Sequence, residues 1–246
     1  MVKGSESPKL VPELIIGLIP MGVLALAFGA WVEAHWMVAL TAIALYGLLT
    51  GLLFREGSSR LPRLGWANRI TLLRAMLVTL PAAALLQPQL FIDAGWTMAL
   101  VALTVLLLDG LDGYLARTLN EESEFGARFD MEVDAALIFV LCLGLALSSA
   151  IGIWVLAIGL MRYAFLAAMV IWPWLSRPLP DSVRRKAVCV WQMTCLVLAT
   201  TPLFGPGVNA MILASALIAL VLSFAGDVAW LYRRRDSNPT ASWRMS

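Results

Sequence analysis

The chain has 246 residues, of which 61% are hydrophobic and 14% are charged, and its mean hydropathy is +0.84. In an ordinary soluble domain about a quarter of the residues are charged, so this composition excludes that class and predicts an all-α, polytopic integral membrane protein. The net charge is only +2, and nothing in the composition favours nucleic-acid binding.

Apolar runs long enough to cross a bilayer follow one another along the chain, and we predict eight membrane helices. The predicted spans are 13–33, 36–54, 69–91, 95–117, 127–148, 151–175, 184–203 and 207–232. The first run shows no clear cleavage site after it, so we interpret it as a membrane helix rather than a signal peptide.

These spans divide the chain into four parts. An N-terminal transmembrane hairpin within 1–54 is expected to be an accessory for packing or for dimer formation. A linker at 55–67, expected at the cytoplasmic interface, leads into a six-helix core at 68–232, and 233–246 forms a cytoplasmic tail.

The distribution of basic residues predicts the orientation. Arg and Lys gather in the connections at 55–68 and 176–186 and in the tail after 232. The connections near 33–36, 88–95, 148–151 and 203–207 contain neither residue. Because basic loops stay in the cytoplasm, we expect both termini there, together with the polar turn at 118–125.

This turn joins two pairs of acids that stand at the ends of apolar spans. Asp109 and Asp112 are three residues apart, and Asp130 and Asp134 are four apart, so each pair projects from one helix face. The short turn would bring the two faces together. Clustered carboxylates repel one another unless cations intervene, and a ligand set of oxygen atoms alone suits Mg²⁺ or Mn²⁺, with two ions able to share the four acids.

The spacing of the whole stretch resembles the signature of the CDP-alcohol phosphotransferases, also called CDP-alcohol phosphatidyltransferases. The residues that carry the resemblance are Asp109, Asp112, Gly113, Ala116, Arg117, Gly126, Asp130 and Asp134. The resemblance implies that the four acids hold the metal ions, with Asp134 also acting as general base. Gly113, Ala116 and Gly126 would let a nucleotide approach the helices closely, while Arg117 would address its phosphates.

The entry to the third span carries a second, shorter motif. Asn68, Thr71 and Arg74 resemble the Asn-x-x-Thr-x-x-Arg start of the first core helix in phosphatidyl-transferring members of the same family. They are therefore expected to contribute to donor binding. Ordinary anchoring at the membrane interface is the alternative interpretation.

Basic residues near the cytoplasmic ends of later spans suggest an acceptor pocket. Arg162 interrupts the sixth span, and Arg185 and Lys186 begin the seventh, with Arg128 as a possible fourth member. Lys186 and Gln192 resemble part of a pattern in phosphatidylglycerophosphate synthases, but Val188 and Cys189 depart from it. The alternative is that residues 184–186 only enforce the topology.

Together the motifs predict a membrane enzyme that moves a phosphatidyl group from CDP-diacylglycerol to a small hydroxyl acceptor and releases CMP. Glycerol 3-phosphate is favoured slightly over inositol phosphate, and family members are commonly homodimers. Two alternatives stay open: transfer from a soluble CDP-aminoalcohol to diacylglycerol, and a cation-binding membrane protein or transporter without enzymatic activity.

Overall fold

The computed structural model describes residues 17–57, 65–119, 121, 123–148, 151–180 and 182–234, and within these ranges it contains helices and no strand. The helices are α2 (Leu18–Trp31), α3 (Trp36–Gly57), α4 (Trp66–Ala84), α5 (Leu90–Asp93), α6 (Gly95–Thr118), α7 (Glu124–Ser148), η1 (Ile153–Val155), α8 (Leu156–Ile171), η2 (Pro173–Ser176), α9 (Val183–Thr200) and α10 (Pro206–Arg233). The prediction of an all-α membrane protein is confirmed.

Each of the eight predicted spans corresponds to one of the longer helices. Five helices in the described part of the chain are long and apolar enough to cross a membrane: α3, α6, α7, the η1–α8 segment and α10. Helix α2 is apolar but shorter, and residues 13–16 of the first predicted span lie outside the described residues, as do most of the predicted linker and residues 235–246 of the tail.

Two predicted spans extend well past the helices that form them, and a proline explains one of the differences. Helix α4 ends at Ala84 instead of 91, and after a turn the chain resumes as the short α5. Helix α8 ends at Ile171, where Trp172 leaves the helical region at φ −120° and ψ 88°. A residue before a proline disfavours helical backbone, and Pro173 follows here.

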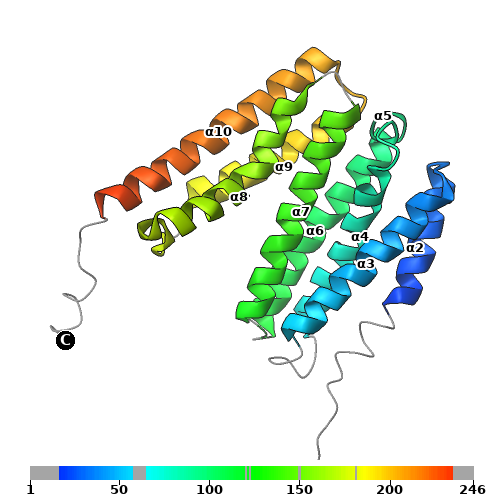
Figure 1. Ribbon diagram of the computed structural model, residues 1–246, viewed down its shortest axis with the longest axis horizontal. Helices are drawn as coiled ribbons and strands as arrows, with labels where there is room; N and C mark the ends of the chain where they lie inside the picture. The colour runs from blue at the N-terminus through cyan, green and yellow to red at the C-terminus, as the bar shows by residue number, and fades with distance from the viewer. Residues whose placement is uncertain are drawn as a thin grey trace, which may run out of the picture.

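Helix α4 is the central packing element of the fold. It packs against α3 on one side and against α6 and α7 on the other, while α2 and α3 form the N-terminal hairpin. Figure 1 shows α8, α9 and α10 on one side of the molecule and α2 on the opposite side. The site residues on α4, α6 and α7 therefore lie between the hairpin and the last three helices.

Two of the connections without basic residues, near 33–36 and 88–95, lie close together at one end of the bundle. The His35 backbone N–H donates to Gln87 Oε1 at 2.9 Å, and the Trp31 indole donates to Thr97 Oγ1 at 3.2 Å. At the opposite end, the Ala67 N–H donates to Glu121 Oε2 at 3.2 Å, so the start of α4 lies against the turn between α6 and α7. The end of α10 is tied to the connection after α8, because Arg177 donates to the Arg234 carbonyl.

Candidate active site

Three polar residues of α4 form a stripe that points into the bundle. Asn68, Thr71 and Arg74 are spaced by three residues and therefore share one helix face. Their exposed fractions are 7%, 3% and 0%. Polar side chains buried this deeply need partners inside the protein.

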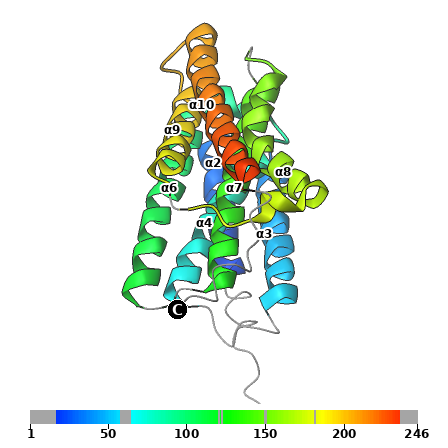
Figure 2. The same ribbon diagram turned by 90° about the vertical axis from the view of Figure 1, so that its left-hand side faces the viewer.

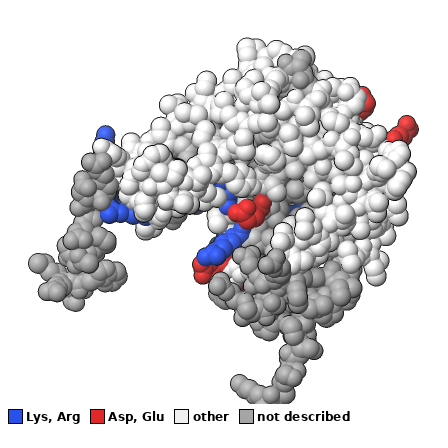
Figure 3. Space-filling view, in the orientation of Figure 1, with Lys and Arg blue, Asp and Glu red and all other residues white. Residues whose placement is uncertain are grey.

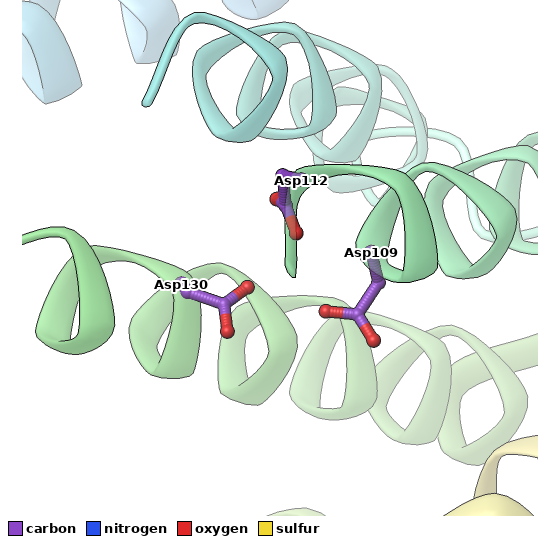
Figure 4. Close-up of side chains that lie close together, drawn as sticks. All are labelled: Asp109, Asp112 and Asp130. Atoms are coloured by element: carbon purple, nitrogen blue, oxygen red, sulfur yellow. The ribbon is translucent and has the colours of Figure 1, made fainter. Parts of the chain in front are cut away.

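Thr71 and Arg74 find such partners among the acids of α6 and α7. One carboxylate oxygen each from Asp109, Asp112 and Asp130 lies within 4.8 Å of the others. Figure 4 shows the side chains of Asp109 and Asp112 from α6 and of Asp130 from α7 converging on one space. The three form a cluster that could hold a divalent ion, and their all-oxygen donor set fits Mg²⁺ or Mn²⁺.

Arg74 lies in the middle of this cluster. Its guanidinium forms ion pairs with Asp109 at 2.9 Å and Asp112 at 2.6 Å, and it also contacts Asp130 and Asp134. A fully buried arginine is strongly unfavourable without opposite charge, and here four carboxylates provide it. The sequence predicted Arg74 as a donor-binding residue and did not anticipate that it would pair with the acids.

Thr71 extends this network. Its hydroxyl lies 3.0 Å from Asp112 Oδ2 and 3.1 Å from the Ala67 carbonyl, so it can donate to either oxygen. Asp112 is only 4% exposed, whereas the side chains of Asp109, Asp130 and Asp134 are about one third exposed. Asp112 is therefore held by α4, and the other three carboxylates remain within reach of a ligand.

A cavity of about 500 Å³ opens beside the cluster, between the adjacent ends of α4, α6 and α7. The predicted donor-binding residues that line it are Asn68, Thr71, Gly113, Ala116, Arg117 and Gly126. Asp112 and Asp130 also line it, whereas Arg74 contacts these two acids and does not line the cavity.

The glycines of this cavity differ in what they require. A Cβ on Gly126 would lie 2.7 Å from Asn68 Oδ1, so a side chain here would displace the Asn68 amide. A Cβ on Gly113 would meet nothing closer than Arg117 Nη1 at 3.6 Å. Gly126 therefore makes room for the Asn68 side chain, while Gly113 leaves open space in the cavity wall.

Glu121 is a cavity residue that the sequence reasoning did not single out. Its carboxylate accepts the hydrogen bond from the Ala67 N–H and lines the cavity. A Cβ on Gly65 would lie 2.6 Å from Glu121 Oε2, so the glycine leaves room for this contact. The sequence around Glu121 does not reveal that it accepts a hydrogen bond from α4, because its partner Ala67 is more than fifty residues away.

The residues predicted to bind the acceptor are distributed over α7, α8 and α9. Arg162 pairs with Glu132 at 2.6 Å, and Arg128 pairs with Glu124 at 2.5 Å. Figure 3 shows acidic and basic side chains next to one another near the middle of a face that is otherwise almost uncharged.

The basic residues of α9 meet an acid of α10. Arg184 and Arg185 contact Asp227 at 2.5 and 3.4 Å, and Lys186 is exposed. Asp227 is 8% exposed and was not predicted. An acid inside the last apolar span, with basic residues at the start of the preceding one, was the signal that could have identified the pair.

The part of the chain that holds this site is similar to a known protein family. The family model described as CDP-alcohol phosphatidyltransferase matches residues 64–225, more than half of the chain. The match begins just before α4 and ends within α10, so it contains the acidic cluster and the 500 Å³ cavity and leaves the α2–α3 hairpin outside. Neither the curated proteins nor the solved structures gave a match. The resemblance predicted from the acidic motif is confirmed.

Proposed function

The chain belongs to the CDP-alcohol phosphatidyltransferase family, and on that premise we propose that it moves a phosphatidyl group from CDP-diacylglycerol to a small alcohol or alcohol phosphate, releasing CMP. The observation that carries this proposal is the 500 Å³ cavity, which is lined by carboxylates, by Arg117 and by small residues. Such a cavity offers space for a nucleotide. Its carboxylates could hold metal ions that neutralise the diphosphate, and Arg117 could bind the phosphates directly.

Asp109, Asp112 and Asp130 would hold Mg²⁺ or Mn²⁺, in a site for one or two ions. When bound, the ions would neutralise the diphosphate and stabilise the CMP leaving group. Arg74 contacts all three carboxylates and would fix their orientation. Arg117 reaches the nucleotide phosphates from α6.

Asp134 is the proposed general base. It lies one turn beyond Asp130 on α7, and its side chain is 36% exposed, so an acceptor hydroxyl can reach it. Asp134 would take the hydroxyl proton as that oxygen attacks the phosphorus that carries the diacylglycerol. The bond from this phosphorus to the bridging oxygen breaks, and CMP leaves with the electron pair.

The test is CMP release by purified protein supplied with CDP-diacylglycerol and, in separate reactions, glycerol 3-phosphate, inositol phosphate, inositol and serine. We expect release to need Mg²⁺ or Mn²⁺ and to be abolished by Asp109→Asn and by Asp130→Asn, because each change removes a charged ligand. Full activity in excess chelator would overturn the metal assignment. Release only from a CDP-aminoalcohol with diacylglycerol would reverse the direction of transfer.

Asp134→Asn separates the base from the metal ligands. We expect turnover to fall by about 10²–10⁴, the range that general-base catalysis contributes, while CDP-diacylglycerol binding is largely retained. Binding of the donor is measured by equilibrium dialysis with the nucleotide part labelled. If binding is lost in proportion to turnover, Asp134 is chiefly a metal ligand.

For the acceptor we propose an alcohol phosphate, with glycerol 3-phosphate ahead of inositol phosphate because of Lys186 and Gln192. A phosphate brings about −1.5 to −2 charges to a site rich in carboxylates, so it needs dedicated cations. Arg128, Arg162 and Arg185 each already contact an acid, and a phosphate could exchange for that partner.

The kinetic test compares the two substrates. Arg162→Ala and Lys186→Ala should raise the acceptor KM more than the donor KM, since only the acceptor would bind there. Unchanged acceptor KM in both variants, or faster turnover with serine than with any phosphorylated alcohol, would contradict the phosphate pocket.

A further inference from the structure

A second cavity of about 620 Å³ lies on the other side of α7 from the acidic cluster, between α3, α4 and α7. Its α3 wall consists of Leu45, Leu48, Leu49, Leu52 and Leu53. The α4 floor is made of Ala75, Val78, Thr79 and Ala82, and these small side chains leave the space open. Helices α3 and α7 each pack against α4, and Figures 1 and 2 show the three helices running roughly parallel to one another.

Helix α7 separates the groove from the 500 Å³ cavity. Phe125, Phe129, Val133, Ala136 and Val140 follow one another at helical spacing and line the groove. Gly126, Ala127 and Asp130 lie on the neighbouring face and line the cavity beside the acidic cluster. One helix therefore presents an apolar face to the groove and a polar face to the candidate active site.

The two spaces share a lining residue at the start of α7. Glu124 lines both of them, and its partner Arg128 lines the groove. Charged residues of the groove lining, Glu124, Arg128 and Glu132, come from the first turns of α7, whereas the rest of the lining is apolar apart from Thr79. The groove is thus polar at the end next to the candidate active site and apolar beyond it, which matches a lipid whose head group lies in that site.

We infer that α3 forms the outer wall of a binding site for an acyl chain of the lipid donor, so that the N-terminal hairpin is a substrate-binding element. The inference rests on the proposed function, because it takes a CDP-activated lipid as the occupant. The leucine wall and the floor of small side chains suit an acyl chain, and the volume of about 620 Å³ is within the range of ligand pockets, roughly 300–1,000 Å³. The hairpin lies outside the matched family region, so this wall is an addition to the family core.

The kinetic experiment narrows the groove and compares two CDP-diacylglycerol donors, one with long acyl chains and one with six-carbon chains. Leu48→Trp adds bulk at a position that is 61% exposed, and Ala82→Leu fills the floor. We expect the KM for the long-chain donor to rise about tenfold in either variant, while the KM values for the short-chain donor and for the acceptor stay unchanged.

The matched control is Leu40→Trp. Leu40 lies on the same helix and is 56% exposed, but it does not line the groove. It should leave the KM of both donors unchanged. Equal changes for the two donors, or a long-chain KM that moves in the control as much as in Leu48→Trp, would overturn the inference.

A binding experiment tests the groove independently of turnover. A CDP-diacylglycerol carrying a photoreactive group at the end of one acyl chain should cross-link to Leu45–Leu53, and unlabelled CDP-diacylglycerol should compete while phosphatidylcholine with the same chains should not. Equal competition by phosphatidylcholine would mean that the groove holds annular lipid only, and would overturn the inference. If the donor cross-links specifically but the protein releases CMP equally well without any alcohol acceptor, the groove is supported. The protein would then hydrolyse the donor, and the proposed transfer to an alcohol would be overturned.

Discussion

At the scale of single residues, Arg74 explains how four carboxylates can lie together inside a membrane protein. The guanidinium contacts Asp109, Asp112, Asp130 and Asp134 from a position that solvent does not reach. One positive charge against four acids leaves the cluster with excess negative charge when all the acids are ionised. The arginine therefore reduces the repulsion and leaves the cluster able to attract further cations.

Arg74→Gln should make the stability of the protein depend on divalent ions. In chelator we expect the variant to lose about 3–5 kcal/mol, the cost of removing one partner from a buried ion pair. Mg²⁺ should then raise its thermal unfolding temperature in detergent by more than it raises that of the unaltered protein. The cause is that the ion supplies positive charge which the guanidinium otherwise provides.

Arg69→Gln is the control for this measurement. Arg69 lies on the same helix and is exposed, with its guanidinium over the Trp66 ring at 4.7 Å. Surface substitutions usually change stability by no more than about 0.5 kcal/mol, so a small shift without added Mg²⁺ dependence is expected. An equal response of Arg74→Gln and the unaltered protein to chelator and Mg²⁺ would contradict the role of Arg74.

At the scale of elements, the turn between α6 and α7 holds the start of α4. Glu121 accepts a hydrogen bond from the Ala67 N–H, one of the N-terminal amides that have no partner within the helix. A carboxylate at this end also interacts favourably with the helix dipole. Asn68 and Thr71 follow directly, so this contact fixes the first turns of the stripe that lines the cavity.

Glu121→Ala should reduce stability by about 0.5–2 kcal/mol, as loss of a helix N-terminal hydrogen bond does, and should raise the donor KM. Glu121→Gln keeps an acceptor oxygen and should change both quantities less. Thermal unfolding and initial-rate kinetics measure the two effects. The interpretation fails if the alanine variant matches the unaltered protein in both.

Elements that depend on local pattern could be predicted from the sequence, and contacts between distant residues could not. The long apolar runs predicted all eight longer helices. The spacing of the four acids at 109, 112, 130 and 134 indicated two acidic helix faces. The pairing of Arg74 with these acids, and of Arg184 and Arg185 with Asp227, depends on which helices become neighbours. The helix end at Ile171 was missed because the effect of Pro173 on the residue before it, Trp172, was given too little weight.

At the scale of the whole molecule, the described parts of the basic connections and the connections without basic residues lie at opposite ends of the helices that they join. Helix α7 begins next to the turn that contains Glu121. It runs toward the opposite end of the bundle, where the His35 N–H donates to Gln87. Basic loops remain in the cytoplasm, so we propose that the turn at 118–125, the candidate active site and both termini face the cytoplasm. A soluble acceptor would then enter from the cell interior.

Cysteine labelling in intact cells tests this orientation. A membrane-impermeant maleimide should label His35→Cys from outside and should leave Thr118→Cys unlabelled until the membrane is opened. The background is the Cys142→Ala, Cys189→Ala and Cys195→Ala triple variant, because the described part of the chain contains these three free cysteines. Labelling of Thr118→Cys in sealed cells would reverse the proposed topology.

The two-faced helix α7 also restricts which changes in chain length the protein can accept. A single residue inserted into an α-helix rotates everything beyond it by about 100°. An insertion between Gly126 and Asp130 would therefore turn Asp130 and Asp134 away from Arg74 and, in the same step, turn Val133 and Val140 out of the groove. Substitutions can alter one face of α7 at a time, whereas insertions and deletions alter both. We therefore expect natural variation in length among close relatives to spare this helix.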